Sequence, residues 1–425
     1  MKVSAAGNTG TGITTQMLCP QCDLVVNIPS LKVGQRCDCP RCHTELTARH
    51  PEPALRPALF AISSLIMLLM ANLYPFITMQ AVGNSNTMLF IQAGTVLFDE
   101  HYQLLSLVVL ACIQGIPAFC MLLLIYLSIA THIKKLPGKV FFCRLLFLLK
   151  PWCMVEIFLI AILVSFVKLV ALADISLDMS FWAFCLFCVL QIRAFQQIDK
   201  EWLWDQIQPL TSRMPLVAGK AGIAQGAKVC RCCSNILPLA EKHCPRCHSR
   251  VHARTPFSLQ MTLALLITSV LLYIPANILP MMATEALGNV SYSTIMEGVI
   301  LLWGMKSYPV ALVIFIASIL VPLSKMLVLF WLCWTASRPD TLHKKTQHFL
   351  YEMVEIIGRW SMVDVFVISI LAALVRIGRL MSIYPGMGAM LFAGVVIITM
   401  LAAFSFDPRL FWDSSSHSQE LSRES

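Results

Sequence analysis

The sequence predicts an all-α polytopic membrane protein with eight spans in two tandem four-helix modules, each preceded by a small cytoplasmic four-cysteine domain of zinc-ribbon or rubredoxin-like type. Three observations lead to this fold class. Of the 425 residues, 57% are hydrophobic and only 13% are charged, about half the charged share of a soluble domain. The apolar residues form runs close to the ~20 residues that a bilayer requires. The pentapeptide CPRCH occurs twice, at 39–43 and 244–248, each time before a block of such runs.

Composition and motifs exclude several classes of protein. The formal net charge is +9, but Lys and Arg in a membrane protein gather in cytoplasmic loops, so nucleic-acid binding is not predicted. The sequence lacks the GxxxxGK[ST] phosphate loop, and we expect neither ATP hydrolysis nor another enzymatic activity. Residues 1–17 lack the apolar core of a signal peptide. The amino terminus is therefore expected in the cytoplasm, where thiols stay reduced and can bind metal.

Two paired-cysteine clusters define the small domains, at 19–50 and 229–252, and residues 1–18 are expected to be a disordered lead-in. Sixteen residues separate the CxxC pairs of the first cluster and ten separate those of the second. This spacing is typical of four thiolates around one tetrahedral ion; a redox dithiol, the alternative for a single CxxC, suits two pairs poorly. The predicted ligands are Cys19, Cys22, Cys39, Cys42, Cys230, Cys233, Cys244 and Cys247. We expect two zinc ions, one per ribbon, although the spacing alone does not separate zinc from iron.

The apolar runs divide the remaining chain into two modules, 57–197 and 257–407, joined by a linker at 198–228 and followed by a polar tail at 408–425. The expected spans are 58–76, 104–130, 152–173, 180–195, 258–281, 308–334, 351–375 and 388–406. Basic residues concentrate in the amino-terminal segment and in predicted loops at 131–150 and 336–350. The positive-inside rule then places both termini and both ribbons in the cytoplasm.

The two modules match each other at a shift of about 205 residues. Asn72-x-x-Pro75 matches Asn277-x-x-Pro280, and Trp152-Cys-Met-Val-Glu156 matches Trp360-Ser-Met-Val-Asp364 after a short insertion. The pair Trp204-Asp205 likewise matches Trp412-Asp413. Four spans per half make these parallel repeats rather than inverted ones.

Together, the duplicated CxxC ribbons, the Asn-x-x-Pro signature and the Trp-x-Met-Val-acidic signature resemble the paraquat-inducible protein A family. The resemblance covers Cys19 to Asp413 and is greatest to the LetA (YebS) type. It implies a protein of the inner membrane of Gram-negative bacteria. It also implies a periplasm-spanning MCE-domain partner and the movement of phospholipids between the two membranes.

Ionisable residues inside spans are functional candidates because each costs about 2.5–3.5 kcal/mol to insert. Lys325 and Asp364 are expected at similar depth, roughly 15–20 Å into the membrane, on neighbouring antiparallel helices. Lys325 has no counterpart in the first half, where Cys120 occupies its position. The predicted polar network consists of Ser318, Lys325, Asp364, Thr399, Asp178 and Glu156. Two interpretations stay open: a buried salt bridge that only fixes helix packing, and a proton-responsive relay that couples conformational change to lipid loading.

The leading functional hypothesis is an intermembrane lipid transport component that exchanges phospholipid-like molecules with an MCE-domain partner. A membrane-embedded redox or metal sensor, signalling through its cytoplasmic ribbons, is the alternative from another class. A metal-ion transporter ranks last, because the spans contain scattered Cys and Met but no recurrent ligand pattern.

Overall fold

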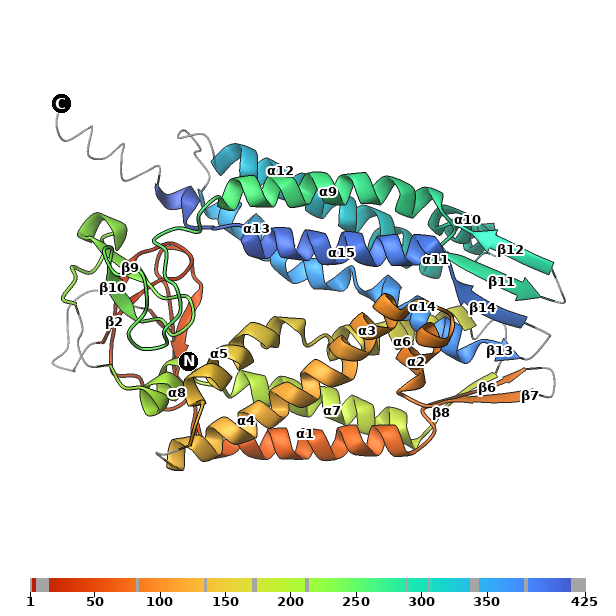
Figure 1. The fold of residues 1–425 in the computed structure, drawn as a ribbon, viewed down its shortest axis with the longest axis horizontal. Coiled ribbons are helices and arrows are strands. Elements are labelled where there is room, and N and C mark those ends of the chain that lie inside the picture. The colour runs from red at the N-terminus through yellow and green to blue at the C-terminus, as the bar shows by residue number, and fades with distance from the viewer. Residues whose placement is uncertain are drawn as a thin grey trace.

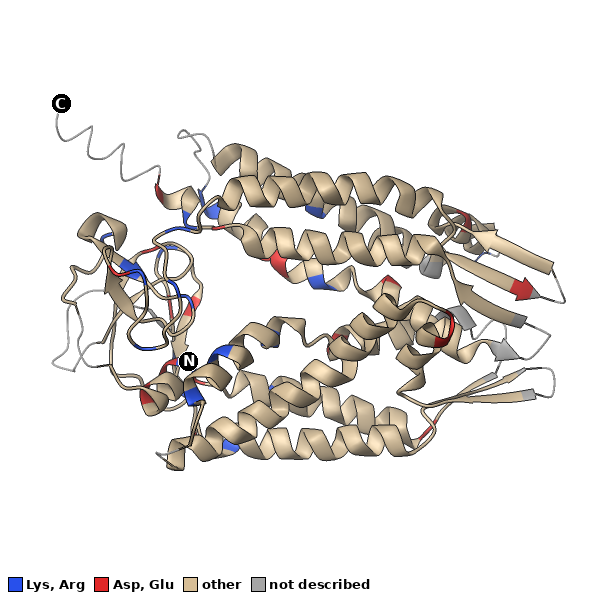
Figure 2. Ribbon diagram, in the orientation of Figure 1, with Lys and Arg blue, Asp and Glu red and all other residues tan. Residues whose placement is uncertain are grey.

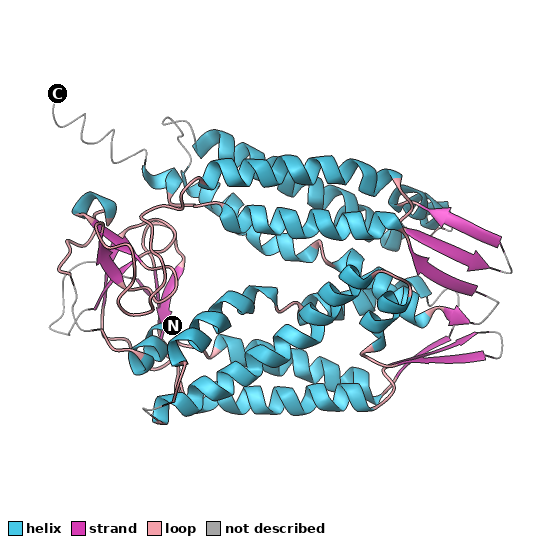
Figure 3. Ribbon diagram, viewed as in Figure 1, coloured by secondary structure: helices cyan, strands magenta, loops and turns pink. Residues whose placement is uncertain are grey.

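The computed structural model describes residues 2–4, 15–81, 84–133, 136–169, 174–210, 214–286, 289–304, 306, 308–336, 344–377 and 381–413. The molecule has three parts along its long axis (Figures 1 and 3). Two cysteine domains lie at one end, two helical bundles form the middle, and short β-sheets lie at the other end. Lys and Arg residues concentrate at the cysteine-domain end (Figure 2).

Eight helical segments of the described residues are long and apolar enough to cross a membrane. They are Leu55–Leu73, Gln103–His132, Lys139–Phe166, Met179–Gln196, Ser258–Ile278, Ile316–Ala336, Lys344–Leu374 and Met387–Asp413. Each overlaps one of the eight runs predicted from hydropathy. A mostly helical chain with eight candidate spans is therefore confirmed.

The first bundle, residues 55–196, is built around α1, which packs against α7 and α4. Its helices are α1 (Leu55–Leu73), α2 (Gln92–Asp99), α3 (Gln103–Leu110), the π-helix η1 (Ala111–Gly115), α4 (Ile116–His132), α5 (Lys139–Leu149), the 3-10 helix η2 (Lys150–Trp152), α6 (Val155–Leu169) and α7 (Met179–Gln196). Small buried residues on α1, Ala61, Ser64 and Ala71, let the neighbouring backbones approach closely, as is usual between membrane helices. Helix α8 (Lys200–Ile207) follows the bundle.

The second bundle, residues 258–405, has its elements in the same order. Its helices are α9 (Ser258–Ile278), α10 (Ile295–Gly304), α11 (Tyr308–Phe315), the π-helix η4 (Ile316–Leu320), α12 (Val321–Ala336), α13 (Lys344–Trp360), α14 (Val363–Leu374) and α15 (Met387–Ser405). Helix α9 packs along α15, as α1 does along α7, and α12 packs against α13.

The bundles meet where α14 packs against α6 and α2. Every residue of α14 is buried, which makes it the central helix of the molecule. Ser369 Oγ donates a hydrogen bond to the Ala93 carbonyl of α2, and Phe366 stacks edge-on against Phe158 of α6, with ring centroids 5.7 Å apart. The joint is thus mainly apolar and lies towards the sheet end.

The prediction of an all-α fold is wrong at the end opposite the cysteine domains. Strands β6 (Ile77–Ala81), β7 (Asn84–Met88) and β8 (Asp174–Leu177) form a sheet in the order β7-β6-β8. Strands β11 (Met282–Ala286), β12 (Asn289–Ser293), β13 (Arg376–Ile377) and β14 (Met381–Pro385) form a second in the order β12-β11-β14-β13. Ala81 pairs with Asn84 and Ala286 with Asn289, so the two strands of each hairpin stay paired up to their ends. A hydropathy scan misses such strands because they are short and partly polar.

The predicted basic loops at 131–150 and 336–350 also need correction, because α5 and α13 begin inside them. The buried residues of α13 recur every three or four positions, at Gln347, Tyr351, Val354 and Gly358, which is the pattern of an amphipathic helix. In α5, Lys139 Nζ donates to the carbonyls of Ala130 and Ile133 at 2.9 and 2.7 Å. The basic residues at the start of these helices made the segments resemble loops, although helical structure already begins there.

The first cysteine domain, residues 15–50, begins within the predicted disordered lead-in 1–18. Thr15–Leu18 form β2, which pairs with β3 (Val25–Ile28); β4 (Arg36–Asp38) pairs with β5 (Glu45–Ala48) and lies parallel to β1 (Lys2–Ser4). The rest of the lead-in, residue 1 and residues 5–14, lies outside the described residues.

The second cysteine domain, residues 227–252, contains the hairpin of β9 (Ala227–Val229) and β10 (Ile236–Pro238), preceded by the 3-10 helix η3 (Ile223–Gln225). The predicted linker 198–228 therefore carries defined structure, including α8. The predicted polar tail 408–425 starts with buried side chains at Arg409, Phe411 and Trp412; residues 414–425 lie outside the described part.

Candidate metal centres and a buried lysine

All four CxxC pairs adopt the same tight turn. The residue after the second cysteine has a positive φ in each: Asp23 at 60°, His43 at 63°, Ser234 at 58° and His248 at 57°. Its N–H donates to the carbonyl of the first cysteine, over 2.8–3.0 Å in the four turns. The histidine of each CPRCH therefore occupies the left-handed position that closes the turn, a role that the sequence did not reveal.

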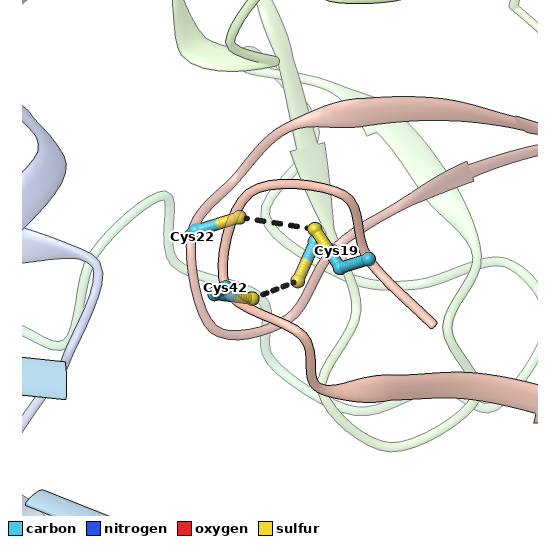
Figure 4. A group of neighbouring side chains, drawn as sticks. Cys19, Cys22 and Cys42 are labelled. Atoms are coloured by element: carbon cyan, nitrogen blue, oxygen red, sulfur yellow. Dashed lines mark hydrogen bonds between the residues drawn. The ribbon is translucent and has the colours of Figure 1, made fainter. Parts of the chain in front are cut away.

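In the first cluster the four sulfur atoms converge (Figure 4). Cys19 Sγ and Cys42 Sγ lie 3.5 Å apart, as do those of Cys22 and Cys39. All four sulfurs lie within 4.8 Å of one another, and the residues are 0–7% exposed. Sulfurs bound tetrahedrally at ~2.3 Å from zinc lie about 3.8 Å from each other. These residues therefore fit a single zinc ion.

The second cluster has the same arrangement. The sulfur pairs Cys230–Cys247 and Cys233–Cys244 are each 3.5 Å apart. A hydroxyl lies beside a sulfur in both clusters, with Ser249 Oγ 3.0 Å from Cys247 Sγ and Thr44 Oγ1 3.3 Å from Cys42 Sγ. The eight cysteines predicted as metal ligands thus form two four-cysteine groups, as the spacing indicated.

The electrostatics of both groups favour a bound cation. Hydrogen bonds from Cys19, Cys22 and Cys39 lower the pKa of Cys42. Hydrogen bonds with Cys19, Cys39 and Cys42 raise the pKa of Cys22. Hydrogen bonds from Cys233 and Cys244 lower the pKa of Cys230 to about 6. Four buried thiolates so close together repel one another, and a divalent ion removes that repulsion. A bound zinc would supply folding energy rather than redox chemistry.

The cysteine cluster of each domain packs against the bundle that does not follow it in sequence. The first domain contacts the end of the second bundle: Arg41 lies 4.4 Å from the ring centroid of Trp412. Thr44 Oγ1 lies 3.3 Å from His348 Nε2 of α13. The cysteines of this domain share an apolar cluster with Leu332, Tyr351 and Phe406 of the second bundle.

The second domain repeats these contacts with the end of the first bundle. Arg246 lies 6.0 Å from the ring centroid of Trp204 in α8 and forms an ion pair with Asp205. Arg144 of α5 donates to the Cys247 carbonyl at 3.5 Å. In both copies the arginine of CPRCH thus stacks on the tryptophan of a Trp-Asp pair.

Buried ion pairs connect the two domains to the end of the second bundle. Asp407 accepts hydrogen bonds from Arg409 Nε and Nη2, both at 2.9 Å, and from the Thr255 N–H at 3.0 Å; Arg231 Nη2 lies 2.7 Å from it. Arg254 Nη2 joins Asp23 of the first domain at 2.9 Å to Asp413 at 2.6 Å. The cysteine domains and residues 407–413 therefore form one connected block.

Lys325 is 2% exposed in the second bundle and donates a hydrogen bond from Nζ to Thr399 Oγ1 at 3.0 Å. A Cβ at Gly358 would lie only 3.0 Å from that Nζ, so the absence of a side chain there leaves room for the ammonium group. Ser318 is also buried, in the π-helix η4. The structure thus joins Lys325 to Thr399, two members of the predicted network.

The other predicted members lie apart. Between Lys325 and Asp364 no ion pair is found in the described part of the chain; Asp364 is 9% exposed in the first turn of α14. Asp178 accepts a hydrogen bond from Thr78 Oγ1 at 2.6 Å, at the sheet end of the first bundle. Glu156 lies at the start of α6 and lines a cavity. The six residues consequently do not form one continuous network.

That cavity, of about 1000 Å³, was not predicted from the sequence. It lies between the first cysteine domain, the start of α6, the end of α7 and α8. Among the residues that line it, burial lowers the pKa of Lys200 and raises that of Asp199. Sequence reasoning singled out Glu156 but had no signal for a space formed by segments so distant along the chain.

The fold and the two cysteine clusters define a multi-pass membrane protein with two candidate metal centres at one end of its helical bundles. The family model for paraquat-inducible protein A matches residues 55–208 and 259–416. The chain belongs to this family, and the resemblance stated from its motifs is confirmed.

Curated relatives match nearly the whole chain. The intermembrane transport protein PqiA of Escherichia coli K12 is 50% identical over 95% of this chain and 97% of its own length. A probable intermembrane transport protein of Haemophilus influenzae is 29% identical over 93% and 95%. The lipophilic envelope-spanning tunnel protein A of Escherichia coli K12 is 30% identical over 93% and 91%. This last relative is the LetA type, so the expectation that the chain most resembles that type is wrong. None of the solved structures compared matches the chain.

Proposed function

We propose that this protein is an integral inner-membrane component of an intermembrane lipid transport system. It moves phospholipid-like molecules to or from a periplasm-spanning MCE-domain partner. The observation that carries the proposal is the 50% identity, over 95% of the chain, with a relative named as an intermembrane transport protein. The name of a second relative, the lipophilic envelope-spanning tunnel protein A, supports a lipophilic cargo. We accordingly assign the chain to transport rather than to catalysis.

The arrangement of charge supports an orientation with both cysteine domains and both termini in the cytoplasm. Lys and Arg gather at the cysteine-domain end (Figure 2), where the positive-inside rule places them. The β-sheets then face the periplasm, on the side of the proposed partner. The proposal keeps the organisation expected from the sequence, two copies of one four-span module with a zinc ribbon before each.

The proposed role of zinc is structural. All eight cysteine ligands are 0–7% exposed, which favours a tightly held ion over the exchangeable or redox-active one that a sensor needs. The alternative of a redox or metal sensor is therefore less well supported. Two zinc ions per chain would stiffen the block that joins the ends of both bundles.

We assign the coupling of transport to an ion gradient to Lys325 and its surroundings. A lysine buried this deeply costs several kcal/mol unless its charge is compensated, and Thr399 alone does not supply a negative charge. A buried lysine at this position is useful if its amine gains and loses a proton during the transport cycle, because the cost of the buried charge then applies to only part of the cycle. Asp364, on the central helix α14, would then receive the signal at the joint between the bundles.

Transfer of radiolabelled phospholipid between the inner and outer membranes of cells that depend on this protein tests the proposal. We expect Lys325→Met to abolish transfer at unchanged protein level. Ser324→Ala is the matched control, because Ser324 is the preceding residue of α12 and is exposed. Transfer that does not depend on the protein at all would refute the transport function, whereas normal transfer by Lys325→Met would refute only the coupling.

A further inference from the structure

The cavity beside Glu156 lies where the first cysteine domain and the two helical bundles meet. Strands β4 and β5 of the first cysteine domain form its outer wall, and α6, α7 and α8 form its sides. Arg359, at the end of α13, reaches it from the second bundle. Its volume of about 1000 Å³ is at the upper end of the range for small-molecule sites. A molecule bound there would touch both bundles and one cysteine domain at once.

The polar residues that line the cavity carry both signs of charge, and some of their atoms lack a hydrogen-bond partner. Five Lys or Arg and four Asp or Glu side chains line the cavity, so their charges nearly balance. Gln191 is only 4% exposed, and its Oε1 has no hydrogen-bond partner in the structure. The Nε of Arg359 is likewise buried without a partner. Buried polar atoms in native proteins are normally satisfied, so Gln191 can accept a hydrogen bond from an occupant of the cavity and Arg359 can donate one to it.

The position of the cavity along the bundle indicates that its occupant also has an apolar part. Phe147, Ile192 and Phe195 line the cavity beside the polar groups. Ile192 lies on the spanning helix α7 and is 36% exposed, so this wall continues onto the face that meets lipid. The cavity is also at the cysteine-domain end of the spans, the level of one leaflet's headgroups. A suitable occupant has a zwitterionic polar part and an apolar remainder.

We propose that this cavity binds the phosphate-and-ammonium headgroup of a zwitterionic glycerophospholipid taken from the cytoplasmic leaflet. The phosphate lies at Arg359 and Lys150, because guanidinium and ammonium groups are the natural donors to phosphate. The ammonium lies at Glu156 and Gln191, which offer carboxylate and amide oxygens. This inference rests on the proposed transport function and adds a loading site to it. Since Arg359 belongs to the second bundle and Glu156 to the first, an occupied site joins the two.

Photocrosslinking of the full-length protein in nanodiscs tests the site. The nanodiscs contain equal amounts of phosphatidylethanolamine and phosphatidylglycerol, which differ in the ammonium group. A benzophenone-bearing residue replaces Ile192 in one sample and Ile267, which is 54% exposed on α9 and away from the cavity, in the control. Mass spectrometry then gives the ratio of ethanolamine to glycerol lipid adducts. We expect the ratio at position 192 to exceed that at position 267 clearly.

Two variants identify the groups responsible. Arg359→Gln is expected to lower the total adduct at position 192 about tenfold, the loss of one charge-assisted hydrogen bond. Glu156→Gln is expected to remove the preference for ethanolamine while leaving the total adduct in place. Zinc content and elution on size exclusion verify that each variant is folded; if Arg359→Gln fails this check, Glu156→Gln still decides.

Several results would overturn the inference. Equal adduct ratios at the two positions, or a preference unchanged by Glu156→Gln, would exclude a headgroup site. Inorganic phosphate that abolishes the adduct at position 192 would assign the cavity to a free phosphate ion instead. If any of these crosslinking results is obtained while the unsubstituted protein still transfers lipid between membranes, the proposed headgroup site is refuted and the proposed transport function stands.

Discussion

Asp407→Asn is expected to destabilise the junction between the second bundle and the cysteine domains severely. The Asp407 carboxylate is completely buried and lies between Arg409, which is 1% exposed, and Arg231. Thr255 adds hydrogen bonds from its N–H and its hydroxyl at 3.0 and 3.2 Å. An asparagine of the same size removes the negative charge and presents N–H groups where the guanidinium groups need acceptors.

The expected loss in the free energy of unfolding follows from the burial of Arg409, which loses its counter-charge in this variant. Removing one partner of a buried ion pair costs about 3–5 kcal/mol, since the other charge stays desolvated and uncompensated. Arg409 is in this position, whereas Arg231, with 46% of its side chain exposed, can turn to water. The comparison variant is Asp413→Asn, because the Asp413 side chain is 33% exposed and its partner Arg254 keeps a second carboxylate, Asp23, at 2.9 Å. Its loss therefore leaves no buried arginine without a counter-charge, and we expect a smaller cost.

Thermal unfolding of the detergent-solubilised protein and the rate of zinc release to a chelator measure the effect. We expect Asp407→Asn to lower the midpoint far more than Asp413→Asn and to speed metal release. The double variant Asp407→Leu, Arg409→Met should recover much of the loss, because apolar residues of similar volume can replace a buried pair. Equal midpoints for the two single variants would refute the reasoning.

Three further outcomes follow from the site and the packing. Cys42→Ser is expected to halve the bound metal, from two ions to one per chain by elemental analysis; full retention would exclude the four-thiolate site. Thr399→Val removes the acceptor of the Lys325 ammonium and should cost about 1–3 kcal/mol in thermal or denaturant unfolding, with rescue by Thr399→Ser; no loss would show that Lys325 has another partner. Gly388→Val should prevent folding or lower the melting midpoint sharply, since its Cβ would lie 2.7 Å from the Leu279 carbonyl just after α9. Gly394→Ala, with open space around it, should change stability by no more than about 0.5 kcal/mol.

The spans and the cysteine clusters were predictable because their signals are local. A run of about twenty apolar residues has few alternatives to a membrane helix. Two CxxC pairs at short spacing form one site wherever the rest of the chain goes, because a short hairpin brings them together. The four cysteines of each predicted site are adjacent in the structure for this reason.

The remaining features depend on contacts between distant segments. Helix α13 begins with Lys344 and Lys345, so hydropathy assigned its first turns to a loop. The strands at the far end are five residues or fewer, too short for a periodicity of two to be convincing. The sequence also placed Lys325 and Asp364 at similar depth, yet the rotation of each helix decides which side chains meet, and Lys325 instead reaches Thr399.

The sequence carries one sign of the crossed packing of the cysteine domains, the repeated Trp-Asp pairs at 204–205 and 412–413. The contacts of these pairs, Arg246 over Trp204 and Arg41 over Trp412, are set by the tertiary structure. A repeat identifies matching residues in two copies but does not say which copy each residue contacts.

That crossed packing has a consequence for biosynthesis. The first cysteine domain is synthesised before Trp412, the residue on which its Arg41 stacks. Its apolar cluster with Phe406, Phe411 and Trp412 can therefore form only after the second bundle has been made. A chain that stops before these residues leaves the apolar face of the first cysteine domain uncovered.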